Sequence, residues 1–103
     1  MSDINYHQIG EVLKLFQIWE EKFKIFTIKN GIEKSEDKRS LSNMASFLFK
    51  NNNIKEEEYL SIKKIISLRN YFIHRLFLDD EESINDITLN TKANLLNTIK
   101  IFE

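Results

Sequence analysis

The sequence predicts an all-α protein, a single domain built as a four-helix up-and-down bundle. Its 103 residues are enough for one hydrophobic core. Glycine occurs twice and proline not at all, which leaves little material for β-hairpins and tight sheet connections. Apolar residues recur at steps of three and four, the period of an amphipathic helix. We therefore expect residues 1–103 to form one helical domain in which sequential helices are antiparallel.

The first predicted helix covers about residues 3–29. Its apolar stripe consists of Ile9, Val12, Leu13, Phe16, Trp19, Phe23 and Phe26. Together with Ile18, the aromatic residues Phe16 and Trp19 widen the stripe beyond one core seam, as a second apolar surface such as a dimer interface would require. We expect these aromatic side chains in the core or an interface, because helical spacing already explains them. Asn30-Gly31 ends the helix, since both residue types accept the left-handed conformation.

A polar connection over residues 33–39 leads to a short second helix. Ser40 is its predicted N-cap, because a serine hydroxyl can accept a hydrogen bond from a free N–H of the first turn. The inner face of this helix consists of Leu41, Met44, Ala45 and Leu48. The asparagine run 51–53 ends it.

The third and fourth helices complete the bundle. Asn53 and Glu56 have the spacing of a capping box and open a third helix, residues 56–78. Its stripe reads Tyr59, Ile62, Ile65, Ile66, Phe72, Ile73, Leu76 and Phe77. The acidic run 79–82 favours a helix N-terminus, so a fourth helix starts there. Its buried face is Ile84, Ile87, Thr91, Leu95, Ile99 and Phe102.

The composition narrows the classes of function. The absence of cysteine excludes disulfides, thiolate metal sites and cysteine nucleophiles. No apolar run approaches the roughly 20 residues that cross a bilayer, and the N-terminus lacks the features of a signal peptide. We therefore expect a cytoplasmic protein without a membrane partner. A net charge of −1 argues against a general nucleic-acid coat protein but leaves room for a small cleft that binds one phosphate.

Arg69 interrupts the apolar stripe of the third helix, between Ile66 and Ile73. A charge at such a position is costly unless it is paired or faces a wet cleft. Asn70 and His74 are four residues apart, so they lie one above the other on a neighbouring face. Arg69 and His74 are five apart, about 140° around the helix, which one helix cannot easily bring together. A second subunit could supply the missing half of a shared cleft.

These residue types suit the cleavage of a phosphodiester. The guanidinium of Arg69 can bind phosphate oxygens bidentately. The imidazole of His74 can take the proton from a ribose 2′-hydroxyl, which then attacks the adjacent phosphate without a metal or a protein nucleophile. Lys63, Lys64 and Arg75 on the same helix either extend a phosphate-binding strip or form a solvated face.

A plainer interpretation remains open for the same residues. Arg69 pairs with an acidic residue such as Glu11 or Glu20, and His74 is an ordinary half-buried side chain. His7 is expected to be a structural or exposed residue, because two histidines give no metal-ligand spacing. The acidic run 79–82 is assigned to a helix N-terminus, and no metal or cofactor is predicted.

Residues 68–77, LRNYFIHRLF, resemble the signature of the HEPN superfamily (higher eukaryotes and prokaryotes nucleotide-binding domains): an arginine, a polar residue that is often asparagine, and a histidine a few residues later. Residues 40–48 look like the short helix that precedes this signature in many small bacterial members. The resemblance implies an all-α bundle that dimerises through the signature helices, the third helix here. In active members it implies a metal-independent ribonuclease, with Arg69 and His74 as the catalytic pair and Asn70 orienting them.

Two main hypotheses follow. The first is a homodimeric endoribonuclease of a toxin–antitoxin or phage-defence system, with RNA as substrate and an antitoxin or defence-system protein as a further partner. HEPN toxins that pair with nucleotidyltransferase antitoxins usually carry tyrosine two residues after the histidine, where this chain has Leu76. The second is a non-catalytic HEPN module that binds a protein partner or a nucleotide in regulation or assembly. An unrelated four-helix interaction protein with a coincidental signature is a third reading.

Overall fold

The computed structural model describes residues 6–31, 40–75 and 81–103, with the side chains of residues 81–83 excepted. This part of the chain is helical and confirms the predicted all-α four-helix bundle. The elements are α1 (Tyr6–Lys29), α2 (Leu41–Lys50), α3 (Glu56–Arg75), α4 (Glu81–Ile99) and a terminal 3-10 helix, η2 (Lys100–Phe102).

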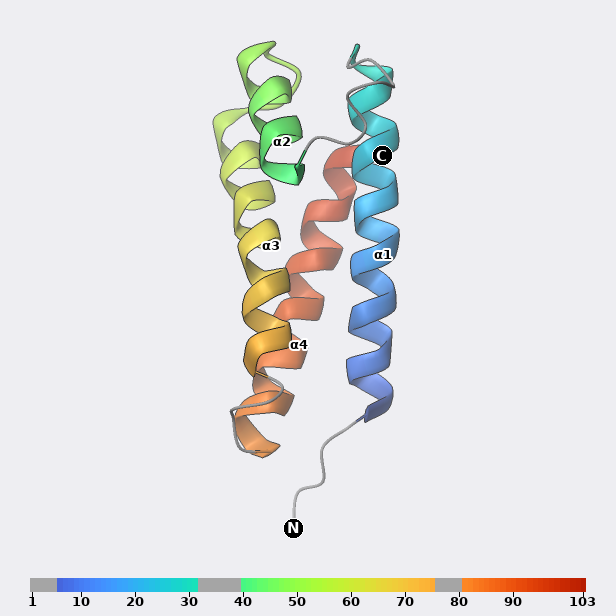
Figure 1. Ribbon diagram of the computed structural model, residues 1–103, viewed down its shortest axis with the longest axis vertical. Coiled ribbons are helices and arrows are strands. Elements are labelled where there is room, and N and C mark those ends of the chain that lie inside the picture. Colours follow the sequence, from blue (N-terminus) through green and yellow to red (C-terminus); the bar gives the residue numbers. More distant parts are fainter. Residues whose placement is uncertain (1–5, 32–39, 76–80) are drawn as a thin grey trace.

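The three long helices α1, α3 and α4 lie along the long axis of the molecule, and the shorter α2 lies beside only one half of α3 (Figure 1). α3 is antiparallel to α2 and α4, as predicted. α1, however, runs in the same direction as α2 and α4 (Figure 1). The predicted alternation of sequential helices therefore fails between α1 and α2. Chain length allows this, because the eleven residues 30–40 between the two helices can bridge up to about 38 Å.

The ends of α1 and α2 follow the predicted turn chemistry. Gly31, after α1, has a φ of 107°, which L side chains rarely adopt. The Ser40 hydroxyl accepts a hydrogen bond of 3.2 Å from the N–H of Asn43 at the start of α2. After α2, Asn52 has a φ of 59°, and the N–H of Asn53 donates to the carbonyl of Leu48 at 2.9 Å. This is the Schellman arrangement, with asparagine in the left-handed position.

The predicted capping box of Asn53 and Glu56 is wrong by two residues. The N–H of Lys55 instead donates to the carboxylate of Glu58 at 2.8 Å. This contact of a capping box therefore starts at Lys55, one residue before α3, and ends at Glu58. The Asn53 amide donates to Asn30 Oδ1 at 3.1 Å. Asn53 therefore ties the α2–α3 turn to the end of α1 rather than capping α3.

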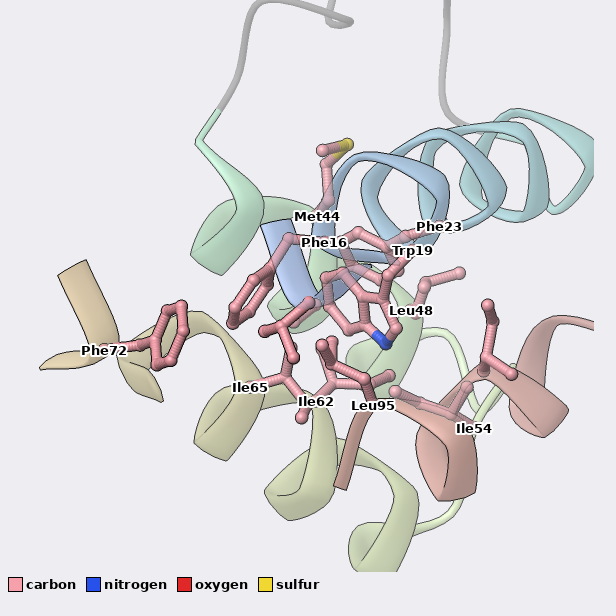
Figure 2. Packing of buried hydrophobic residues seen from close by; sticks show 13 residues of the cluster. Phe16, Trp19, Phe23, Met44, Leu48, Ile54, Ile62, Ile65, Phe72 and Leu95 are labelled. Carbon is pink, nitrogen blue, oxygen red and sulfur yellow. The ribbon is translucent and has the colours of Figure 1, made fainter. Parts of the chain in front are cut away.

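The core is one cluster to which all four helices contribute, and Figure 2 shows its largest members together. Trp19, 1% exposed, donates to the Thr98 hydroxyl at 3.0 Å, so its polar atom is satisfied inside the apolar core. Its ring stacks on Phe23, with centroids 5.2 Å apart, and meets the ring of Phe102 edge-on at 5.4 Å. Phe16 is buried as well, so of the residues considered for a second apolar surface only Ile18 stays exposed.

Among the described residues of the predicted inner stripes, two are exposed. Leu13 of α1 is 38% exposed and Ile73 of α3 is 41% exposed. The cause is the length of α2, which has 10 residues against 20 in α3. Because the two helices are antiparallel and share a turn, α2 reaches only about half of α3. The second half of α3, which carries the signature, therefore keeps an open flank.

Thr88 and Thr98 of α4 are buried, although neither was assigned to its inner face. The Thr88 hydroxyl donates to the carbonyl of Ile84 at 2.7 Å, and that of Thr98 to the carbonyl of Asn94 at 2.9 Å. Bonds within the helix thus allow threonine to occupy core positions. Leu76 and Phe77 of the predicted third-helix stripe lie outside the described residues.

Candidate functional site

Arg69 forms an ion pair with Glu20 that joins α3 to α1. The Arg69 side chain is 47% exposed and that of Glu20 is 20% exposed. About one turn from this ion pair on each helix, Phe16 of α1 contacts Phe72 of α3, with ring centroids 6.1 Å apart. Pairing of Arg69 with Glu20 was one of the alternatives considered for Arg69 from the sequence. The ion pair offsets the cost of placing a charge at the edge of the core.

Asn70 and His74 are both exposed, on consecutive turns of α3. The expectation of a half-buried His74 is therefore wrong. Ile73 is the residue that the short α2 leaves uncovered. Viewed down the axis of α3, it leaves the helix between Arg69 on one side and Asn70 and His74 on the other. A ligand in solution can reach both polar side chains.

Within one chain, Arg69 and His74 do not converge. They leave α3 about 140° apart, with Arg69 turned toward Glu20 of α1. A surface depression exists elsewhere, over the first turns of α1, and is lined by Tyr6, His7, Gly10, Glu11 and Lys14. It contains none of the signature residues. A single copy of the described chain thus presents the signature as a surface rather than a pocket.

The three cations considered for RNA binding fall on two lines of α3. Lys63 is half-buried and shares a line with Asn70 and His74, since spacings of 7 and 11 residues return to one side of a helix within about 20°. Lys64 is exposed and shares the adjacent line with Arg75. Both lines belong to the same outer surface of α3.

The guanidinium of Arg75 lies over the ring of Tyr71, 5.3 Å from its centroid. Sequence reasoning did not single out Tyr71. The signal was available, because an aromatic residue and an arginine four positions apart on a helix are neighbours.

His7 belongs to a surface cluster that joins the start of α1 to α4. Its Nε2 lies 3.0 Å from one carboxylate oxygen of Glu11, and Lys92 Nζ lies 3.2 Å from the other. The hydrogen bond and charge of Lys92, with a smaller contribution from His7, lower the pKa of the Glu11 carboxyl below its usual range. Water screens these exposed groups, so the cluster contributes little to stability. His7 is an exposed surface residue, which agrees with its predicted role.

In the described parts of the chain, no three His, Cys, Asp or Glu side chains lie close enough together to hold a metal ion. The acidic run 79–82 falls outside this description, except that α4 begins at Glu81. None of the described helices is both long and apolar enough to cross a bilayer.

Known protein families, curated proteins and solved structures were compared with the chain, and none matches it. Fold and surface together define an all-α four-helix bundle that displays Arg69, Asn70 and His74 on the second half of its third helix.

Proposed function

We propose that the protein is a metal-independent endoribonuclease of the HEPN type that acts as a homodimer in a toxin–antitoxin or phage-defence system. The supporting observation is that Arg69, Asn70 and His74 all reach solvent from the half of α3 that extends beyond α2. A buried or mutually blocked set of side chains could not serve this chemistry. RNA is the substrate, and an antitoxin or another defence-system protein is a further partner.

The proposed dimer pairs the exposed halves of α3 from two copies. In this dimer His74 of one copy lies toward Arg69 of the other, and because a two-fold interface is self-complementary the reverse contact forms as well. The apolar side chain of Ile73, 41% exposed between the two lines, is suited to the centre of this contact. Two composite clefts, or one shared cleft, then contain both the cation and the imidazole.

In the proposed reaction, His74 takes the proton of a ribose 2′-hydroxyl, and the 2′-oxygen attacks the adjacent phosphorus. The bond from phosphorus to the 5′-oxygen breaks, and that oxygen takes up a proton from water as it leaves. The products are a 2′,3′-cyclic phosphate and a 5′-hydroxyl end. Arg69 stabilises the charge on the non-bridging oxygens, and the Asn70 amide helps to orient the phosphate.

The ion pair with Glu20 is compatible with this role of Arg69. The contact involves Nη1 of the guanidinium. A guanidinium carries five N–H donors, so others stay available for phosphate. Glu20 also fixes the direction of a long side chain, which reduces the entropy that Arg69 loses on binding RNA.

The test is incubation of the purified chain with RNA in excess chelator. We expect cleavage that the chelator does not diminish, with 2′,3′-cyclic phosphate ends. Intact RNA, cleavage that stops in chelator, or fragments with 5′-phosphate ends would contradict the proposal.

The same ion pair is the observation that favours a second candidate, a non-catalytic module that binds a protein partner or a nucleotide. Glu20 already supplies a negative partner for Arg69, so the arginine has a structural use without any phosphate. RNA that stays intact in the assay, together with a stable complex between the chain and a nucleotide or protein, would support this candidate.

A further inference from the structure

A line of side chains on the outer surface of α3 has no part in the reaction proposed above. It consists of Lys64, Tyr71 and Arg75, which recur at helical spacings of seven and four residues. Tyr71 is 46% exposed, and the guanidinium of Arg75 lies 5.3 Å from the centroid of its ring. The cation lies against the ring, and much of the residue faces solvent.

Along this stretch of α3 the charged side chains are of one sign. Between Tyr59 and Arg75 the chain has four lysine and arginine residues and no carboxylate, although its net charge is −1. The acidic residues of α3 are confined to the first turn, Glu56 to Glu58. The helix dipole favours this separation of charge, but it does not explain an exposed aromatic ring among the cations. Cations along a helix with an aromatic ring between them are the features that bind a single-stranded nucleic acid.

We propose that Tyr71 is a stacking platform for an unpaired base of RNA, and that Arg75 and Lys64 bind the flanking phosphates. The identity of the ligand as RNA rests on the function proposed above. Single-stranded RNA fits the platform and duplex RNA does not, because the flat faces of paired bases are covered by their neighbours in the stack.

The position of the platform relative to His74 supports this role. Tyr71 and His74 are three residues apart, so their Cβ atoms lie about 5–6 Å from each other on adjacent turns. A base on the Tyr71 ring therefore places its own ribose or the next one beside the imidazole. Tyr71 would thus select the strand and set the register of cleavage without taking part in proton transfer.

The test measures binding of an unstructured single-stranded RNA and of a duplex of the same length. It uses the full chain with His74→Ala in every sample, so that bound RNA is not cut. Tyr71→Ala is compared with Tyr71→Phe, which keeps the ring. The matched control is Leu60→Ala, an exposed apolar residue three turns earlier on the same line, 58% exposed.

We expect Tyr71→Ala to weaken binding of the single strand by roughly 5- to 150-fold, the range that loss of one stacked base produces. Tyr71→Phe, Leu60→Ala and the affinity for duplex should all change by less than about twofold. No detectable binding, an unchanged Tyr71→Ala variant, or an equal loss in Leu60→Ala or on duplex would overturn the platform. Cleavage is assayed separately with His74 present. Loss of the ribonuclease proposal therefore does not change the interpretation of the binding result, and loss of the platform does not change the interpretation of the cleavage assay.

Discussion

Replacing His74 with alanine should lower the rate of RNA cleavage by about 100- to 10,000-fold, the usual contribution of a general base. The loss should appear in kcat more than in KM, since the imidazole acts on the 2′-hydroxyl proton and not mainly on binding. The side chain is exposed on α3, so its removal leaves the core intact. Initial rates on a defined RNA, with circular dichroism to verify helix content, make the measurement.

The chain provides its own control, because His7 is its only other histidine. The His7 side chain is 84% exposed and contacts Glu11 at the start of α1, away from the signature. His7→Ala should therefore cleave RNA at the wild-type rate. Equal rates in wild type and His74→Ala, or equal losses in both variants, would exclude His74 as the general base.

The largest effect on stability is expected for Trp19→Ala, about 3–5 kcal/mol of unfolding free energy. The indole is 1% exposed, stacks on Phe23 and donates to Thr98, so the change removes packing from the centre of the core. A loss of this size is a large share of the total stability of a domain of about 100 residues. Trp19→Phe should lose less, since a ring remains against Phe23.

Urea unfolding followed by circular dichroism measures the effect, because the variant lacks the only tryptophan and its fluorescence. Leu96→Ala on α4, 45% exposed, is the control and should change stability by no more than about 0.5 kcal/mol. A Trp19→Ala variant within about 1 kcal/mol of wild type would contradict the central position of Trp19.

Much of the fold was predictable because its signals are local. The steps of three and four fixed the four helices, and Ser40 and Gly31 marked their ends through hydrogen bonds and φ angles within a few residues. The relative direction of α1 and α2 was not predictable, since it depends on how the whole chain packs. The exposure of Ile73 likewise depends on where α2 stops alongside α3, a tertiary property that the stripe of α3 does not contain.

The candidate site divides in the same way. Helix geometry alone placed Asn70 above His74 and separated Arg69 from His74. The choice of Glu20 over Glu11 as partner of Arg69 required the tertiary structure, in which Glu11 is taken by Lys92. The contact of Arg75 with Tyr71 is local and was predictable from their spacing of four residues. The sequence prediction for this surface included its cations but not the aromatic ring.

The central claim is that two copies of the chain complete one site, and mixing two inactive variants tests it most directly. Arg69→Gln, whose amide can still donate to Glu20, and His74→Ala are each expected to be inactive. Co-refolded at equal amounts, half of the dimers contain both variants, and where the dimer has two composite clefts, one of the two in each mixed dimer has Arg69 and His74 intact. The mixture should then recover about one quarter of the wild-type rate. A mixture that forms mixed dimers, verified with two affinity tags, yet cleaves RNA no faster than either variant while wild type is active, would contradict the shared site.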